Sequence, residues 1–579
     1  MLFIGWVDCL DPTQITLEIS TDIPCSELHE TSISSGTLAQ LESRPAVATT
    51  AHCEPATGRV GSIVLVPGQS GDAATRVVAA FGARKTADEC VAAGFKGGCI
   101  VARRSVRYVS HTRLRLPVRL EGVCADMPCK ADETCVNGQC VPAMVDCDPI
   151  VGCVPSTDGG AVATIARSFG GAGDDWVSAL ARDADGNVYV GGMISGQVDF
   201  GRGAVTAFAM GSPFATSFDA MLAPRWTYVQ AAKSSSAAYG IAVTAANAYL
   251  AGAADGIDNG AGTVVSNAAF YEDLKSQDGA PVNGQAFVNT RGYAVAADDQ
   301  GNVWLGGLCF FGMGNILGAT CPPGAFLLAA FDANKKVRWM KALAANTAGG
   351  TVTSLALRGN HLIAGGVITA PLDIGGGPLP YAGMSDAFVA SFRADDGSHE
   401  WSRSFGDAGL QVVHGVASDA SSVWAVGDMG GSLVAGGMTL TSAGYDDVFV
   451  LRLDPASGAP IFARRFGGPN EENGRAIAVD PKGNAWMCGW FQTSGDFGGG
   501  NVSSKGTQDV FVTSLGTDGM VRAARAYGGT GSSQCYAIAA DARAIYLGGQ
   551  LSGTLDFGGG STPLKSAGVL DGFVVKMAE

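Results

Sequence analysis

The chain has 579 residues, of which 83 are glycine, about 14 % and twice the roughly 7 % of average usage. Charged residues make up only 16 %. This composition excludes a coiled coil and a charged disordered chain, and it disfavours helix because glycine costs about 1 kcal/mol at an interior helical position. The net charge is −15, of which −11 (25 basic minus 36 acidic groups) lies in residues 157–579. Because such a surface repels phosphate backbones, we expect no nucleic-acid partner.

The first residues do not form a complete export signal. Met1 to Val7 is apolar but lacks a basic segment before it, and Asp8 ends the run. Asp8 also disfavours Cys9 as a lipid-modified residue, since a small residue is needed there. We therefore expect a start codon upstream of Met1 that restores a signal peptide. No apolar run approaches the roughly 20 residues of a spanning helix, so no transmembrane segment is expected.

The part of the chain before residue 157, which we call the leader, is predicted to form β-structure. Strand-like runs at 15–19, 61–66, 76–81 and 114–120 are separated by Gly, Pro or Asp clusters. We predict a remnant N-terminus at 1–8, a β-sandwich-like domain at 9–122, a short disulfide-rich segment at 123–153 and a linker at 154–160.

Five arginines of this leader share parity: Arg103, Arg107, Arg113, Arg115 and Arg119. In a strand, alternate residues lie on one face, so these side chains are candidates for binding the phosphate or carboxylate groups of an envelope polysaccharide. The alternative is a solvated sheet face.

Eleven of the 15 cysteines precede residue 157. Six of them have no histidine nearby and lack the C-x2-C spacing of zinc sites, which predicts disulfides in an oxidising compartment, extracellular or in the cell envelope: Cys124, Cys129, Cys135, Cys140, Cys147 and Cys153. The alternative is a cytosolic protein with reduced thiols.

The rest of the chain is a repeat with a period near 60 residues. The segment Asp-x-Phe-Val begins at Asp386, Asp447, Asp509 and Asp571, at steps of 61, 62 and 62 residues. Residues 157–579 therefore hold about seven units, each with about four short strand-like runs separated by Gly and Asn turns. This predicts an all-β chain ending in a seven-bladed β-propeller at 161–579.

These motifs resemble a known repeat. Arg-Arg-Phe-Gly-Gly at Arg464, Asn-Val-Tyr-Val-Gly-Gly at Asn187, Asp-Phe-Gly at Asp496 and Asp-Val-Phe-Val at Asp509 are similar to the bacterial seven-bladed propeller repeat SBBP, of myxobacterial type. The resemblance implies a secreted or surface scaffold. The Cys-containing leader is also similar to leaders of myxobacterial envelope proteins.

Two stretches depart from the repeat. Residues 254–286 lack an Asp-x-Phe-Val strand, and insertions in repeat proteins often map to the binding face. We therefore consider residues 267–285 a partner site, with Phe270, Tyr271, Glu272 and Asp273 as candidates. Cys309 and Cys321 are expected to form a local disulfide that pins a second irregular loop.

Two further expectations concern ring geometry. The strand near 162–169 should pair with the last strand at 572–577, so that the first and last segments share a blade and no edge stays open. Cys488 and Cys535 fall in neighbouring blades, and packed sheets about 10 Å apart exceed the reach of a disulfide, so we expect buried thiols.

Recurrent acids have a structural and a functional interpretation. We expect one acid per blade to accept backbone N–H groups at the start of a strand, namely Asp219, Asp386, Asp447, Asp509 and Asp571, rather than to form a cation ring. Asp183-x-Asp185-Gly-Asn187 imitates the start of a calcium loop but lacks the glutamate at its twelfth position, so a hairpin turn is favoured.

No catalytic motif stands out. The six histidines are scattered, and no H-E-x-x-H, G-x-S-x-G or P-loop occurs. We expect a non-catalytic, monomeric binding or scaffold protein without cofactor or metal, whose partner is a protein or an envelope polysaccharide. The alternatives are a polysaccharide hydrolase or lyase, which would place unrepeated acids and a histidine at one mouth of the ring, and a structural envelope protein with a blade-symmetric surface.

Overall fold

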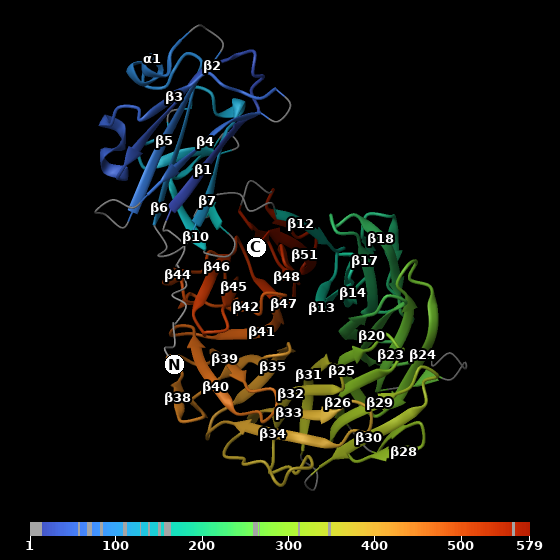
Figure 1. Cartoon of the computed structure of the whole chain (residues 1–579). Helices are drawn as coiled ribbons and strands as arrows, with labels where there is room; N and C mark the ends of the chain where they lie inside the picture. The colour runs from blue at the N-terminus through green and yellow to red at the C-terminus, as the bar shows by residue number, and fades with distance from the viewer. Residues whose placement is uncertain are drawn as a thin grey trace, which may run out of the picture. The chain divides into compact units, whose positions relative to one another are not determined.

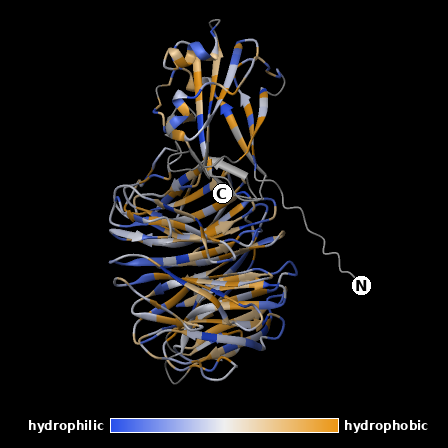
Figure 2. Cartoon of the chain, turned by 60° about the vertical axis from the view of Figure 1, so that its left-hand side comes forward, coloured by the Kyte–Doolittle hydropathy of each residue, from blue (hydrophilic) through white to orange (hydrophobic). Residues whose placement is uncertain are grey.

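The computed structural model describes residues 14–578, except 56–57, 67–71, 82–84, 108–112, 128, 137–138, 149–151, 156–163, 259–263, 266, 311–312, 345–348 and 559–561. The expected start at Met1 to Cys9 therefore lies outside the described residues. The chain forms two compact units, Met1–Val162 and Ala163–Glu579 (Figure 1). In both units the strands carry most of the hydrophobic residues (Figure 2).

The first unit contains two sheets. One has the order β4-β1-β7 and the other β11-β10-β6-β5-β2-β3. Their strands are β1 (Gln14–Thr21), β2 (Leu28–Gly36), β3 (Ala48–Thr50), β4 (Arg59–Leu65), β5 (Asp72–Phe81), β6 (Cys99–Arg107), β7 (Arg113–Leu120), β10 (Met144–Asp148) and β11 (Gly152–Pro155). The remaining elements are η1 (Leu38–Ser43), α1 (Ala87–Ala92), η2 (Gly122–Cys124) and the hairpin β8 (Glu133–Val136) and β9 (Gln139–Pro142).

Alternation along the strands builds the core of this unit. Leu17 and Ile19 of β1 alternate with polar residues, and they pack in one cluster with Leu116 of β7 and Val77 of β5. Because successive side chains in a strand point to opposite faces, this pattern buries one face of each sheet against the other.

The disulfide-rich segment is not separate from the sandwich. Strand β10 pairs with β6, and Cys124 and Cys135 belong to the core cluster. The boundary expected at residue 122 is therefore too early, because the segment completes the larger sheet. Disulfides join Cys25 to Cys53, Cys90 to Cys99, Cys124 to Cys135 and Cys129 to Cys140. Cys147 lies opposite Cys153 in the β10–β11 ladder.

The second unit is a ring of seven sheets with at least four strands each in the described residues. We number the sheets as blades along the chain. Blade 1 consists of β13 (Trp176–Arg182), β14 (Val188–Ile194), β17 (Ser212–Phe218) and β18 (Pro224–Val229). Blade 2 consists of β19 (Ala237–Val243), β20 (Asn247–Ala254), β23 (Ala268–Lys275) and β24 (Pro281–Val288). Blade 3 consists of β25 (Thr290–Ala297), β26 (Val303–Cys309), β29 (Phe326–Phe331) and β30 (Val337–Leu343). Blade 4 consists of β31 (Gly350–Arg358), β32 (His361–Ile368), β33 (Asp386–Arg393) and β34 (His399–Phe405). Blade 5 consists of β35 (Gln411–Ser418), β36 (Val423–Met429), β39 (Asp447–Leu453) and β40 (Pro460–Phe466). Blade 6 consists of β41 (Glu472–Val479), β42 (Ala485–Phe491), β45 (Asp509–Leu515) and β46 (Val521–Tyr527).

Blade 7 closes the ring with strands from both ends of the unit. It consists of β47 (Ser533–Ala540), β48 (Ala544–Leu551), β51 (Asp571–Ala578) and β12 (Thr164–Phe169). The expected pairing of β12 with β51 is confirmed, with Ser168 opposite Phe573. The fold is thus all-β, a β-propeller preceded by a sandwich.

Short hairpins lie between the second and third strands of several blades. They are β15 (Gln197–Asp199) with β16 (Ala204–Thr206), β21 (Ile257–Asp258) with β22 (Val264–Val265), β37 (Ser432–Ala435) with β38 (Met438–Thr441), β43 (Ser494–Asp496) with β44 (Asn501–Ser503), and β49 (Thr554–Leu555) with β50 (Leu564–Lys565). The hairpin of β27 (Gly314–Ile316) and β28 (Ala319–Cys321) instead extends blade 2, and a disulfide joins Cys321 to Cys309 in blade 3.

The innermost strands follow one another around the axis (Figure 1). The chain enters each of them on one side of the ring, which we name the N-face, and leaves toward the second strand on the other side, the C-face. The third strand of each blade begins on the N-face.

One disulfide corrects a prediction. Cys488 of β42 and Cys535 of β47 are bonded across blades 6 and 7, with their Cα atoms 5.9 Å apart. The spacing of about 10 Å between packed sheets does not hold near the axis, where blades converge. At the position equivalent to Cys488 in blade 7, a Cβ on Gly548 would lie 2.6 Å from Val177 of the next blade. Cys488 and Cys535 therefore occupy a close contact that other blades make with glycine and an apolar residue.

Candidate functional site: the N-face mouth of the ring

Each innermost strand carries a β-bulge at one equivalent residue. The seven bulged residues, which we call the bulge ring, are all polar or aromatic but differ from blade to blade: Ser178, Tyr239, Tyr293, Thr353, His414, Arg475 and Tyr536. Their neighbours in the strand, such as Cys535 and Ala537, are buried in the blade. Because a bulge redirects a side chain, these residues point away from the blade core toward the axis.

The second strand explains why the bulge recurs. In every blade a glycine of this strand pairs with the residue before the bulge, and a Cβ on the one in blade 7, Gly549, would lie 2.0 Å from the carbonyl oxygen of Gln534. A side chain there is sterically excluded, so the glycines that mark the repeat in the sequence allow the close approach that a bulge requires.

Contacts within the bulge ring link neighbouring blades. The hydroxyl of Ser178 donates to the carbonyl of Ala238, and that of Thr353 donates to Val413, each at 2.5 Å. The rings of Tyr239 and Tyr293 lie 5.3 Å apart. These contacts link blade 1 to blade 2, blade 2 to blade 3 and blade 4 to blade 5.

Over blades 5 to 7 the bulge ring forms a charged chain of contacts. The Nε2 atom of His414 bonds to the carboxylate of Asp428, which is nearly buried. A carboxylate only accepts, so Nε2 carries the proton and Nδ1 faces the Nη1 atom of Arg475 at 3.4 Å as an acceptor. The guanidinium of Arg475 lies 5.8 Å from the ring centre of Tyr536. Among the described residues, Arg475 makes no ion pair with a carboxylate.

Three glutamine amides lie beside Tyr536. The hydroxyl of Tyr536 donates to Oε1 of Gln534, which also accepts from Nε2 of Gln550 at 2.6 Å. Nε2 of Gln534 donates to Oε1 of Gln508 at 2.7 Å, and the Ser532 hydroxyl donates to the same oxygen at 2.7 Å. These residues come from different segments of blades 6 and 7, so the network is made by the fold.

Two acids complete the mouth. Asp446 bridges to Glu471 through the backbone, and Glu471 accepts from Nε2 of Gln492 at 3.2 Å. Burial raises the pKa of Asp446, and the negative charges of Asp428, Glu471 and Asp447 raise it further. The mouth of blades 5 to 7 thus brings together unrepeated acids, a histidine, an arginine and amides.

The same face has an exposed apolar rim. Two residues before the third strand, four blades carry a large apolar side chain that is mostly exposed: Met210 (82 %), Met384 (72 %), Tyr445 (79 %) and Val569 (66 %). Thr507 is the equivalent residue of blade 6. The Tyr445 N–H donates to Asn470 and the Met384 N–H to Gly409, so the rim loops rest on the lead into the next innermost strand.

The structure does not support the partner site expected at residues 267–285. Phe270 and Tyr271 belong to β23, the third strand that the sequence did not reveal, and both are buried. Asp273 is also buried and pairs with Lys335 beside a hollow of about 320 Å³. The prediction is wrong for these three side chains, because their burial prevents contact with a partner. Glu272 is half-buried, and burial together with the Asp273 charge raises its pKa to about 7.

The expected arginine face is also wrong. Arg103 and Arg107 lie in β6 and Arg113, Arg115 and Arg119 in β7, and these strands belong to different sheets. Arg119 is exposed, with its Nη2 3.8 Å from Asp22. The side chains of Arg107, Arg113 and Arg115 lie outside the described residues.

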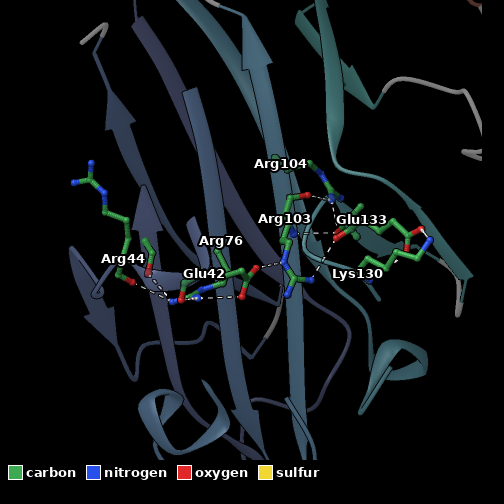
Figure 3. A network of polar contacts seen from close by, with 9 residues as sticks. Glu42, Arg44, Arg76, Arg103, Arg104, Lys130 and Glu133 are labelled. Atoms are coloured by element: carbon green, nitrogen blue, oxygen red, sulfur yellow. Dashed lines mark hydrogen bonds and ion pairs between the residues drawn. The ribbon is translucent and has the colours of Figure 1, made fainter. Parts of the chain in front are cut away.

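Arg103 is buried in a polar network (Figure 3). Its Nε donates to Glu42 at 2.5 Å, and Arg76 donates to the same carboxylate at 3.3 Å. Arg104 donates to the carbonyl of Arg103 and to Thr134, and burial lowers its pKa to about 10. These arginines fasten the strands and loops of the sandwich to one another.

The recurrent acids cap backbone groups as expected. Asp509 accepts from the N–H groups of Lys505 and Gly506, and Asp571 from Ala567 and Gly568, while Asp386 and Asp447 accept from Ala382 and Ala443. Asp219 differs in position, because it follows its strand and accepts from Met221 and Ala223 in the turn.

The calcium-like segment forms a hairpin turn. The carboxylate of Asp183 accepts from the backbone and side chain of Asn187 and from the Tyr189 hydroxyl. Asp298 and Asp480 hold Asn302 and Asn484 in the same way. In the part of the chain that the structure describes, no group of three or more His, Cys, Asp or Glu side chains is placed to hold a metal, and no helix is long and apolar enough to cross a membrane.

Comparison with known proteins adds no family. No protein-family profile matches the chain, and no curated protein is significantly similar to it. Solved structures that resemble it include BamB from Moraxella catarrhalis (11 % identity, 70 % of this chain and 86 % of that chain, TM-score 0.32) and the Pan2 WD40 domain from Neurospora crassa (8 %, 70 % and 89 %, TM-score 0.37). Another is a quinohemoprotein alcohol dehydrogenase from Comamonas testosteroni (11 %, 70 % and 76 %, TM-score 0.34). Similarities this low carry no argument about function.

Proposed function

We propose that the chain is an exported, non-catalytic binding protein of the extracellular space or cell envelope, and that its ring docks a partner protein on the N-face. The observation that carries the proposal is the apolar rim of Met210, Met384, Tyr445 and Val569. Exposed large apolar residues at equivalent positions on one face are typical of a protein-binding surface, and methionine adapts well to a partner. Six disulfides in the described residues favour an oxidising compartment, and the resemblance to the SBBP repeat supports a surface scaffold.

The charge beside the rim indicates the chemistry of this partner. Asp174, Asp407, Asp446 and Glu471 lie in loops of the N-face. A partner surface that combines apolar and basic side chains complements both features.

Photocrosslinking followed by affinity measurement tests this function. The photoreactive residue p-benzoylphenylalanine replaces Met384 or, as the C-face control, Met520, in cells that make the protein. We expect a crosslinked protein from position 384 only. With that protein purified, Tyr445→Asp should weaken binding at least tenfold, as expected for an interface anchor, and Met520→Asp should leave it unchanged. Equal crosslinking from both positions, or a Tyr445→Asp variant that binds normally, would contradict the proposal.

A second candidate function is hydrolysis of a polysaccharide. Asp446 favours it, because a carboxyl with a raised pKa beside the carboxylates of Asp428 and Glu471 resembles the pairing of a general acid with a second carboxylate. The test is release of reducing ends from soluble polysaccharides, which Asp446→Asn should abolish. A purely structural role, by contrast, gives no reason for unrepeated polar residues at one mouth.

A further inference from the structure

We propose that the mouth of blades 5 to 7 binds an uncharged sugar unit of a polysaccharide. This site lies inside the apolar rim and goes beyond the proposed protein-docking function.

The mouth has unused hydrogen-bonding groups of both kinds. The NH2 group of Gln508 and the carbonyl oxygen of Gln550 make no hydrogen bond within the described residues, and Arg475 has no carboxylate partner there. Asp446 and Glu471 add acceptors. Sugar hydroxyls both donate and accept, so they match this mixed set.

The amides are held in place before a ligand arrives. Gln534 makes three side-chain hydrogen bonds, to Tyr536, Gln550 and Gln508, and Ser532 fixes the oxygen of Gln508. Binding therefore costs little side-chain entropy, and the directions of the free amide groups are set by the network.

The local charge excludes an acidic ligand. The mouth holds three carboxylates, from Asp428, Asp446 and Glu471, but among its contacts with His414 only one guanidinium, that of Arg475. A uronate, phosphate or sulfate would meet net repulsion. A cation would use the carboxylates but leave the fixed amides without a role.

Aromatic rings supply the apolar surface that the C–H face of a sugar ring needs. Tyr536 lies next to the amides, and Tyr239, with 36 % of its surface exposed, and Tyr293 stand elsewhere in the bulge ring. Aromatic side chains bury apolar surface while a polar edge stays hydrogen-bonded, which suits the C–H face of a pyranose.

Isothermal titration calorimetry of the full chain with defined hexasaccharides tests this inference. The probes are cellohexaose, maltohexaose, mannohexaose and chitohexaose, with hexagalacturonate and hexalysine as charged counterparts. We expect at least one neutral hexamer to bind and both charged probes to bind at least tenfold more weakly. Binding of none of the neutral hexamers, or tighter binding of either charged probe, would overturn the proposal.

Matched variants locate the site. Gln508→Ala and Gln550→Ala should each weaken neutral-sugar binding about tenfold, since each removes a hydrogen-bonding group from a desolvated contact. Gln300→Ala, in a C-face turn, should change nothing. Unfolding temperatures verify that the variants fold, and normal sugar binding by both mouth variants would contradict the assignment.

Two further arms separate this inference from the proposed functions. Met384→Asp should leave sugar binding intact even where it abolishes protein docking. Chromatography of the titrated sugar distinguishes binding, which leaves the hexamer whole, from hydrolysis by the second candidate function.

Discussion

Residues 267–285 and the mouth of blades 5 to 7 differ in what a departure from the repeat means. An irregular sequence accompanies a buried strand in the first region, whereas regular blades carry variable side chains outside the core in the second. The first stretch has lost the repeat motif, yet it supplies buried β23 with Phe270 and Tyr271 in the core. The second lies in blades that match the repeat well, yet His414, Arg475 and Tyr536 differ at one equivalent, partly buried position. Divergence of a whole stretch therefore reflects an alternative way to fill a core, whereas variation at one bulged position marks a surface free to acquire function.

The largest expected effect is on stability at the irregular stretch. Phe270→Ala should lower the free energy of unfolding of the ring by about 3–5 kcal/mol, because it leaves a cavity in a packed core. Chemical denaturation measures this change. The matched mouth variant, Tyr536→Phe, should cost less than about 1 kcal/mol. Similar losses in both variants would remove the distinction between the two regions.

The second-largest effect on the stability of the ring is expected from loss of the disulfide between blades 6 and 7. Replacing Cys488 and Cys535 together by alanine should destabilise the ring by about 2–4 kcal/mol, since the bond closes a loop between blades 6 and 7. As a control, removing Cys25 and Cys53 should affect the unfolding transition of the first unit and leave that of the ring in place. An unchanged ring transition in the first variant would show that the thiols are not bonded.

The stability of the ring should depend on pH through Glu472. Burial raises the pKa of this carboxyl to about 8 from its usual 4.5, with the Asp447 charge adding to the effect. The folded ring then holds a proton that the unfolded chain releases, so stability falls as pH rises from about 4.5 to 8. Glu472→Gln should reduce the slope of the unfolding temperature across this range, and the raised pKa of Glu272 should leave part of the slope in place. Equal slopes in the wild type and in Glu472→Gln would contradict this assignment.

The smallest effect on stability is expected at the rim. Tyr445→Asp should change the free energy of unfolding by no more than about 0.5 kcal/mol, because the side chain is exposed and has no core contact to lose. A large loss in thermal unfolding experiments would mean that the rim stabilises the fold, and its use as a docking surface would then need another basis.

The sequence was sufficient for the fold of the ring but not for its site. Motifs such as Asp-Val-Phe-Val at Asp509 recur because each third strand must fill the same core, and this gave the period, the strands and the closing pair of β12 and β51. The acids that cap backbone groups were predictable for the same reason. The disulfide between Cys488 and Cys535 was not anticipated, although aligning the repeats places Cys488 at a position of close contact between blades that is glycine in blades 1, 3, 4 and 7.

The mouth could have been found only by comparing equivalent positions. Asp428 follows the second-strand motif where Gln550 stands in blade 7, and His414 occupies the bulge where blade 7 has Tyr536. These substitutions break no motif, so a search for irregular stretches passes over them. Contacts between blades, such as that of Arg475 with His414, join positions one repeat apart, but their chemistry depends on side chains that the repeat motif does not fix.

Hydrogen–deuterium exchange of the full chain, with and without a saturating neutral hexasaccharide, tests the central claim most directly. Both regions are monitored in one experiment. We predict slower exchange on binding in peptides that cover residues 472–478, 506–510, 532–538 and 548–552, and no change in residues 268–285. Protection of residues 268–285 with an unchanged mouth would contradict the claim that the sugar-binding residues of this ring lie at the N-face of blades 5 to 7.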